Sequence, residues 1–177
     1  MLTSSLQMHL KKALTFWFMQ SLITSLKSPL TATLPLTMFK RQIEQILKLD
    51  ARDKFWGVYP IDLLPKRQQG AYVINLDIHD EPGSHWVAVY DDGKTVEYFD
   101  SYGLPPTCLE FLGTSYNYSS VQLQPLLSLA CGYYCCYFLI HRIQGLTMSK
   151  IVNVLDRCDS HYIVKNYLYS RFSPIFK

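Results

Sequence analysis

Apolar residues near the start of the chain recur every three to four positions, a spacing that predicts amphipathic helices. One such helix is expected over residues 6–22, ending before Ser28-Pro29. A connector with two prolines, "SPLTATLPL", leads to a second helix. The apolar face of that second helix is formed by Phe39, Ile43, Ile46 and Leu47.

The middle of the chain has a different pattern, typical of strands. Residues 71–78, 85–91 and 95–100 are rich in β-branched and aromatic side chains and predict three strands. Residues 55–65, "FWGVYPIDLLP", combine Gly and Pro with aromatic residues and show no period, so we predict an ordered loop there.

Helical spacing returns after a variable loop at 104–120. The apolar stretch 131–145 predicts a buried helix ending at Gly145, followed by helices at 148–157 and 160–171. The predicted fold is therefore α+β, a mixed or antiparallel sheet packed against a central helix that begins at Cys131. We expect a helical N-terminal extension over 1–50 and a single domain over 51–177.

The two adjacent strands 85–91 and 95–100 place a histidine and an acid close together. If Asp92-Gly93 forms a two-residue type I′ turn, the numbers of facing residues sum to 185, and His85 faces Asp100. Facing side chains lie on one side of the sheet within hydrogen-bonding reach, so Asp100 could orient the imidazole of His85. An incidental polar pair at the strand ends remains the alternative.

Composition supports one sizeable core, because 49% of the residues are hydrophobic and 14% are aromatic. The net charge of +3 conceals an acidic middle, since residues 51–107 carry five basic and nine acidic side chains. No long run of Lys and Arg is present, so the charge allows at most weak nucleic-acid binding. The longest uncharged stretches are shorter than the ~20 residues that a spanning helix needs, and we expect no transmembrane segment.

The cysteines do not form a disulfide pattern. They are odd in number and irregularly spaced, which predicts a reducing, intracellular setting. No set of Cys and His has the spacing of a zinc site, so no metal is expected. Four of the histidines have no acid or thiol partner that the sequence places beside them, and we interpret them as surface or structural residues: His9, His79, His141 and His161.

Cys131 is a candidate nucleophile because it begins the predicted helix. Unpaired N–H groups and the helix dipole favour a thiolate at such a position, and pairing with His85 would favour it further. Gln124 lies seven residues upstream, where its amide and the N–H of Cys131 could form an oxyanion hole. The alternatives are a small core residue at Cys131 and a solvated amide at Gln124.

Three motifs resemble those of the adenovirus proteinase (adenain) family, including its relatives from Maverick/Polinton-type virus-like elements, within a wider clan that contains the Ulp-type SUMO proteases. They are "GSHW", "YFDSYG" and "QPLLSLACGYYCCYFL". The resemblance implies His85 as base, Asp100 as orienting acid, Gln124 as oxyanion donor and Cys131 as nucleophile, in the permuted papain-like order of that clan. Asp100 stands where adenovirus members carry Glu, and Asp followed by Ser is the Ulp-type pattern.

The resemblance also implies an activity: a cysteine endopeptidase without cofactors that matures viral or mobile-element precursor proteins at small-residue or Gly-containing sites. The implied substrate cleft includes Gly83, Trp86 and Gly132, and the implied location is the host nucleus or the virion. An activating peptide is a further implied partner, although only Cys108 lies in a loop comparable to its attachment site. Two alternatives stay open: a protease acting on ubiquitin-like modifiers, and a catalytically silent peptide-binding module.

Overall fold

The computed structural model describes residues 37–176, and the helix predicted over 6–22 lies outside them. The chain divides into two compact units, Met1–Thr33 and Leu34–Lys177, so the description below concerns the second unit. Among the described residues, no helix is both long and apolar enough to cross a bilayer.

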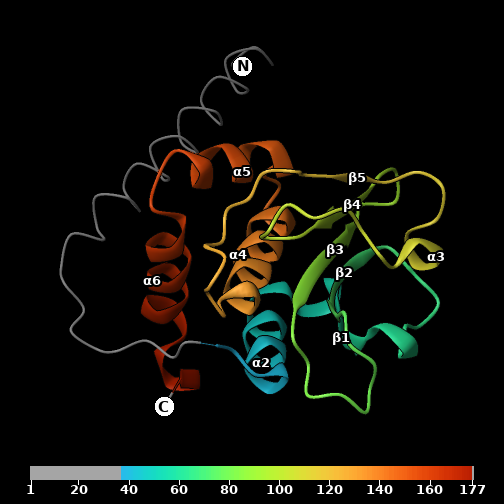
Figure 1. The fold of residues 1–177 in the computed structure, drawn as a ribbon, viewed down its shortest axis with the longest axis horizontal. Coiled ribbons are helices and arrows are strands. Elements are labelled where there is room, and N and C mark those ends of the chain that lie inside the picture. Colours follow the sequence, from blue (N-terminus) through green and yellow to red (C-terminus); the bar gives the residue numbers. More distant parts are fainter. Residues whose placement is uncertain (1–36, 177) are drawn as a thin grey trace, which may run out of the picture. The chain divides into compact units, whose positions relative to one another are not determined.

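Helices and a five-stranded sheet make up this unit, and Figure 1 shows α4 lying between the sheet and α6. In chain order the elements are α2 (Lys40–Ala51), η1 (Arg52–Lys54), β1 (Phe55–Pro60), η2 (Ile61–Leu63), β2 (Gly70–Asn75), β3 (Trp86–Asp91), β4 (Val96–Phe99), α3 (Leu109–Leu112), β5 (Asn117–Tyr118), α4 (Cys131–Ile143), α5 (Met148–Asp156), α6 (Ser160–Phe172) and η3 (Ser173–Phe176).

The sheet is mixed, as predicted. Its strands lie in the order β1-β2-β3-β4-β5, with parallel pairing at β1–β2 and β4–β5 and antiparallel pairing at β2–β3 and β3–β4. All six residues of β2 are buried, because both faces of the sheet are covered. The fold class is therefore confirmed as α+β.

The central helix α4 packs on one face of the sheet. The rings of Phe99 in β4 and Phe138 in α4 stack with centroids 4.4 Å apart. The other face carries a second apolar cluster, in which Tyr72 and Tyr98 of the sheet are covered by Cys108 and Leu112 from the α3 segment. The short elements α3 and β5 lie in the stretch that we predicted as a variable loop.

Helix α2 matches the second predicted helix except at its start. Ile43, Ile46 and Leu47 are fully buried, as expected, but Phe39 is 69% exposed. Phe39 precedes the helix, and its carbonyl accepts the N–H of Ile43. Because Phe39 takes the N-cap position, its side chain does not follow the helical stripe. Helix α2, which we expected in an N-terminal extension, packs on α4 within the second unit.

The ordered loop predicted over 55–65 is wrong for its first half, which is the edge strand β1. The pairing with β2 shifts between Phe55 and Gly57, so Trp56 has no partner in the register and is 42% exposed. Gly57, with φ +147°, allows this β-bulge. The extra residue breaks the alternation of buried and exposed positions that would have revealed a strand.

The hairpin of β3 and β4 forms, but its predicted register is wrong. Asp91 pairs with Val96 and Ala88 with Phe99, so facing numbers sum to 187 instead of 185. The tip is Gly93-Lys94, because the carboxylate of Asp92 accepts the N–H groups of Lys94 and Thr95. An Asp side chain that binds the backbone two residues ahead favours this turn over a type I′ turn centred on Asp92-Gly93.

The C-terminal helices follow the prediction closely. Gly145, just beyond α4, has φ +95°, the left-handed conformation expected after a helix end. The carboxylate of Asp159 accepts the N–H of Tyr162 and caps α6.

Strand β2 ends at Asn75, three residues before the predicted end.

Candidate active site

Cys131 is the first residue of α4 and is 5% exposed. The first amides of a helix have no partner within it, so their N–H groups and the helix dipole face this end. The next residue, Gly132, serves packing: a Cβ there would lie 3.0 Å from Met38 Cβ and 3.1 Å from Ile43 Cδ1. Gly132 therefore lets α2 approach α4 and is not among the residues that line the cleft described below.

His85 and Asp100 meet as predicted, although the register differs. His85 Nε2 lies 3.0 Å from Asp100 Oδ1, and the N–H of Tyr102 donates to the same oxygen at 2.7 Å. A register error of two residues preserves side-chain facing, so Asp100 becomes a diagonal neighbour of His85 and stays in reach. The paired strands end at Ala88 and Phe99, and Tyr102 lies in the turn that follows, with its ring centroid 5.0 Å from that of His85.

The surroundings of His85 favour its charged form. Burial opposes the charge, but side-chain hydrogen bonds to Asp100 and Cys131 outweigh it and raise the pKa of His85 to about 9. The structure thus joins the candidate base to the acid on one side and to the thiol on the other.

Gln124 is buried, with 1% exposure, and every polar atom of its side chain is engaged. Its Oε1 accepts the hydroxyl of Ser101 at 2.6 Å. Its Nε2 donates to the carbonyl oxygen of Ser128 at 2.7 Å and to the hydroxyl of Tyr102 at 3.1 Å. Gln124 is therefore close to the site but does not line the cleft.

A cleft of about 790 Å³ runs past these side chains. It is lined by His85, Trp86, Tyr102 and Cys131, with Gly83 in the loop before His85. Gly83 has φ +87°, and a Cβ there would lie 2.4 Å from Asn75 Nδ2, so the loop closes tightly on the end of β2.

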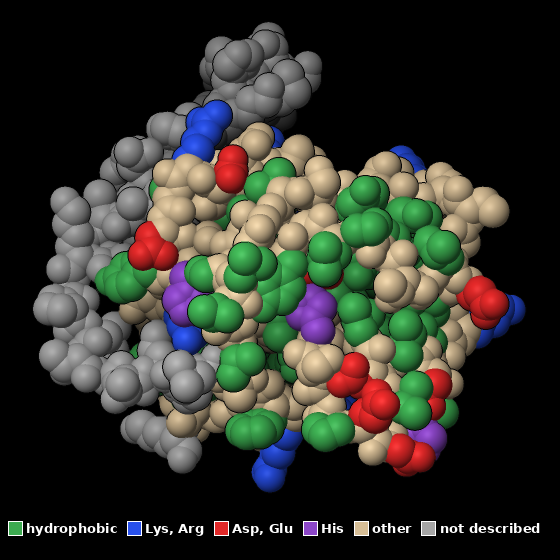
Figure 2. Space-filling model, in the orientation of Figure 1, with side chains coloured by type: hydrophobic (Ala, Val, Ile, Leu, Met, Phe, Trp, Pro, Cys, Tyr) green, Lys and Arg blue, Asp and Glu red, His purple; other side chains and the backbone are tan. Residues whose placement is uncertain are grey.

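Exposed apolar side chains flank the cleft. Four of them line it: Leu129 before α4, Phe39 before α2, Leu63 in η2 and Ile78 after β2. Figure 2 shows hydrophobic side chains in several groups across this face, with an acidic group at its lower right. Such a surface suits an extended peptide with apolar side chains.

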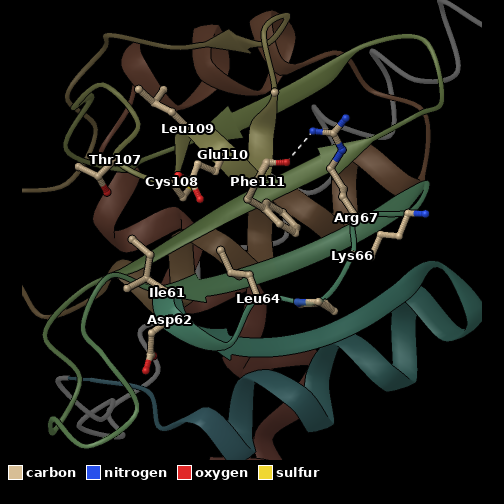
Figure 3. A pocket seen from close by; sticks show the side chains of 12 residues that line it. Ile61, Asp62, Leu64, Lys66, Arg67, Thr107, Cys108, Leu109, Glu110 and Phe111 are labelled. Carbon is tan, nitrogen blue, oxygen red and sulfur yellow. Dashed lines mark hydrogen bonds between the residues drawn. The ribbon is translucent and has the colours of Figure 1, made fainter.

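A second groove, of about 1010 Å³, lies between the segment after β1 and α3 (Figure 3). Arg67 crosses its end and donates to the carbonyl oxygen of Phe111 at 2.7 Å. Cys108 lines this groove, and burial raises the pKa of its thiol to about 11. That thiol stays protonated near neutral pH, unlike a reactive cysteine.

The remaining cysteines and histidines have structural surroundings. Burial raises the pKa values of Cys135 and Cys136 on α4, and His141 bonds to the carbonyl oxygen of Tyr137 at 2.7 Å. The expectation that His79 lacks an acid partner is wrong, because its ring bonds to Asp62 and Asp80. Asp80 is the next residue in the chain, and loop folding brings Asp62 to His79, which the sequence does not reveal. Within residues 37–176, no three His, Cys, Asp or Glu side chains are grouped as metal ligands.

Sequence reasoning placed Tyr102 in the core or the cleft lining but did not predict the hydrogen bonds that Tyr102 and Ser128 make with Gln124. Strand alternation does not place Tyr102, because it lies in the turn after β4, closed by the N–H of Gly103 on the carbonyl oxygen of Asp100. The carbonyl of Ser128 carries no sequence signal, because a backbone acceptor can belong to any residue.

Comparison with known proteins gives a match in structure only. No family model matches the sequence, and no curated protein matches it. Two crystal structures of the ASFV pS273R protease, one of them with selenomethionine, are similar to this chain, with TM-scores of 0.52 and 0.51 and 16% sequence identity. The match covers 73% of this chain and 65% of that protease. The chain therefore has a fold that resembles a viral protease, over about two thirds of that protein's length.

Proposed function

We propose that this chain is a cysteine endopeptidase. The observation that carries the proposal is that Cys131 and His85 line one cleft, that Asp100 is hydrogen-bonded to His85 from behind, and that Cys131 is close enough to help raise the pKa of His85. The resemblance to a protease fold supports it. An Asp that holds a charged imidazole beside a thiol at a helix start is an arrangement suited to acyl transfer.

In the first step the Cys131 thiolate attacks the scissile carbonyl carbon, forming a C–S bond while the carbonyl electrons move to oxygen. The N–H of Cys131 and the Gln124 side chain stabilise this oxyanion. When the carbonyl reforms, the C–N bond breaks and the leaving amine takes the proton of His85. Water then gives a proton to His85 and attacks the thioester, which releases the acid and restores Cys131.

The substrate that we propose is a viral or mobile-element precursor cut at a small-residue or Gly-containing site. The motifs around His85, Asp100 and Cys131 that resemble those of the adenain family support this substrate class. Replacing Cys131 with Ala should abolish precursor cleavage while the fold persists by circular dichroism. Cleavage retained in that variant would refute the assignment.

Alkylation tests the activated thiol without a known substrate. Iodoacetamide should modify Cys131 faster than the exposed Cys158, and His85→Ala should slow Cys131 at about pH 7 by at least about tenfold. His79→Ala is the matched control, because this exposed His is paired with Asp62 and Asp80 and should leave the rate unchanged.

Two other outcomes of these assays would favour the alternatives. Slow, uniform alkylation of all thiols would favour a silent peptide-binding module. Labelling of Cys131 by ubiquitin or SUMO with a C-terminal electrophile would favour a protease for ubiquitin-like modifiers.

A further inference from the structure

Ser101, the residue after Asp100, binds the side chain of Gln124. Ser101 is fully buried, and its hydroxyl donates to Gln124 Oε1 at 2.6 Å. Its carbonyl oxygen also accepts the backbone N–H of Gln124 at 2.9 Å. Ser101 itself lies in the turn that the N–H of Gly103 closes on the carbonyl oxygen of Asp100. One short turn therefore carries both the acid that holds His85 and the hydroxyl that holds Gln124.

The nitrogen end of the Gln124 amide is directed toward the cleft. Nε2 donates to the carbonyl oxygen of Ser128 at 2.7 Å and to the hydroxyl of Tyr102 at 3.1 Å, and both of these residues line the cleft. The two acceptor oxygens lie 2.9 Å apart, so one N–H can bridge them. The second N–H then remains for an oxyanion, which agrees with the role proposed for Gln124.

The orientation of the amide decides whether Gln124 can act. Rotated by half a turn, the amide would place Oε1 against the carbonyl oxygen of Ser128, where neither atom is a donor, and would direct both N–H groups away from the cleft. Ser128 therefore disfavours the rotated form. The hydroxyl of Ser101 favours the observed form, because it supplies the donor that the buried Oε1 needs.

We propose that Ser101 is a positioning residue that holds the amide of Gln124 in the orientation that stabilises the oxyanion. The inference rests on the proposed endopeptidase function and deepens it. Ser101 does not line the cleft, so its hydroxyl acts only through Gln124. By donating to Oε1 it fixes the amide and also polarises it, which strengthens the N–H as a donor. Without the hydroxyl, Oε1 is a buried acceptor that lacks a donor, and the amide moves to find one.

Ser101→Ala tests this role in the hydrolysis of a fluorogenic peptide ending in Gly-Gly-aminomethylcoumarin. The backbone hydrogen bond between residue 101 and Gln124 persists in this variant, so only the side-chain contact is lost. We expect kcat to fall at least about tenfold with little change in KM, because loss of a whole oxyanion donor costs about 10²–10³-fold. A peptide aldehyde ending in glycinal should lose affinity in parallel with kcat, because its adduct carries the oxyanion.

Two controls separate this role from a merely structural one. Alkylation of Cys131 by iodoacetamide forms no oxyanion, so its rate in Ser101→Ala should stay within about twofold of wild type. Ser160→Ala is the matched variant, because the buried hydroxyl of Ser160 donates at 2.6 Å to the carbonyl oxygen of Leu123, the residue before Gln124. It should lower the free energy of unfolding as Ser101→Ala does, but leave kcat within about twofold of wild type.

A double-mutant cycle shows whether Ser101 acts through Gln124. Gln124→Met keeps the length of the side chain without its amide and should lower kcat by about 10²–10³-fold. Ser101→Ala added to Gln124→Met should lower kcat little further, because the hydroxyl then has no amide to orient. Effects that add fully in the double variant would overturn the proposal.

Two other results would also overturn it. One is a Ser101→Ala variant that keeps the kcat of wild type. The other is alkylation slowed as much as hydrolysis, which would mean that Ser101 acts through the neighbouring Asp100. In an active wild type these results refute only the role of Ser101. A wild type that hydrolyses the peptide no faster than Cys131→Ala refutes the endopeptidase and this role together.

Discussion

Replacing Asp100 with Asn removes one charge from the site and keeps the shape of the side chain. The neutral oxygen can still accept the N–H of Tyr102 and the ring N–H of His85. Burial alone lowers the pKa of His85, and the contacts with Asp100 and Cys131 raise it to about 9 from 6.5. Without the carboxylate, we expect the pKa of His85 to fall toward 6.5 or below.

The contribution of His85 to folding stability can be worked out from its raised pKa. A rise from 6.5 to about 9 corresponds to about 3 kcal/mol of preference for the charged imidazole in the folded state. Because the folded pKa is the higher one, this contribution to stability is complete below pH 6.5 and is lost as pH rises through about 9. In Asp100→Asn the His85 contribution to the pH dependence of the unfolding free energy should largely disappear across this window.

NMR titration of the histidine ring protons measures the pKa directly, with His85→Gln used to assign the signal, and urea unfolding at several pH values measures the stability. Asp62→Asn is the control, because it removes a carboxylate bound to a different, exposed histidine, and it should leave His85 unchanged. A pKa for His85 that stays near 9 in Asp100→Asn would show that Asp100 is not its cause.

Two glycine substitutions test packing around the site. Gly132→Ala would place a Cβ 3.0 Å from Met38 Cβ and 3.1 Å from Ile43 Cδ1. We expect this crowding to lower the free energy of unfolding, measured in urea, by about 1–3 kcal/mol. A variant more stable than wild type would mean that α2 can move away. Gly83→Ala combines a left-handed φ with a contact at 2.4 Å to Asn75 Nδ2, and should reduce both thermal stability and peptide hydrolysis. Gly145→Ala is the control, because Gly145 has a similar φ but no atom within 4 Å of the added Cβ. If Gly83→Ala lowers thermal stability no more than Gly145→Ala does, the contact with Asn75 contributes nothing.

The elements that the sequence predicts well are those whose period is uninterrupted. The stripe at Ile43, Ile46 and Leu47 and the apolar run from Cys131 both produce helices at the expected places. The edge strand β1 was missed because one bulge residue, Trp56, shifts the alternation by a single position. One inserted residue reverses which side chains of a strand face the core, so the alternation is lost. The apolar stripe of a helix is about 100° wide, so a small irregularity leaves most of its residues on the same face.

Gln124 illustrates a different limit. Its presence near Cys131 could be expected from spacing, but its hydrogen-bond partners could not, because two of them are a backbone carbonyl and a tyrosine from another segment. Sequence spacing indicates which side chains can reach a site. Only the full set of donors and acceptors shows which partners each of them engages.

His85 and Asp100 lie within hydrogen-bonding reach although the predicted register of the hairpin is wrong, because the register is wrong by an even number of residues. Moving the turn by one residue changes the sum of facing numbers by two, and side chains alternate with a period of two. The face of each residue is therefore preserved, and only the choice between a directly opposite and a diagonal partner changes. An imidazole and a carboxylate bridge the longer diagonal, here with Nε2 and Oδ1 at 3.0 Å. Tyr102 lies beyond the paired residues, in the turn that the N–H of Gly103 closes on the carbonyl oxygen of Asp100, and its ring contacts His85 from that turn, where the register of the hairpin no longer applies.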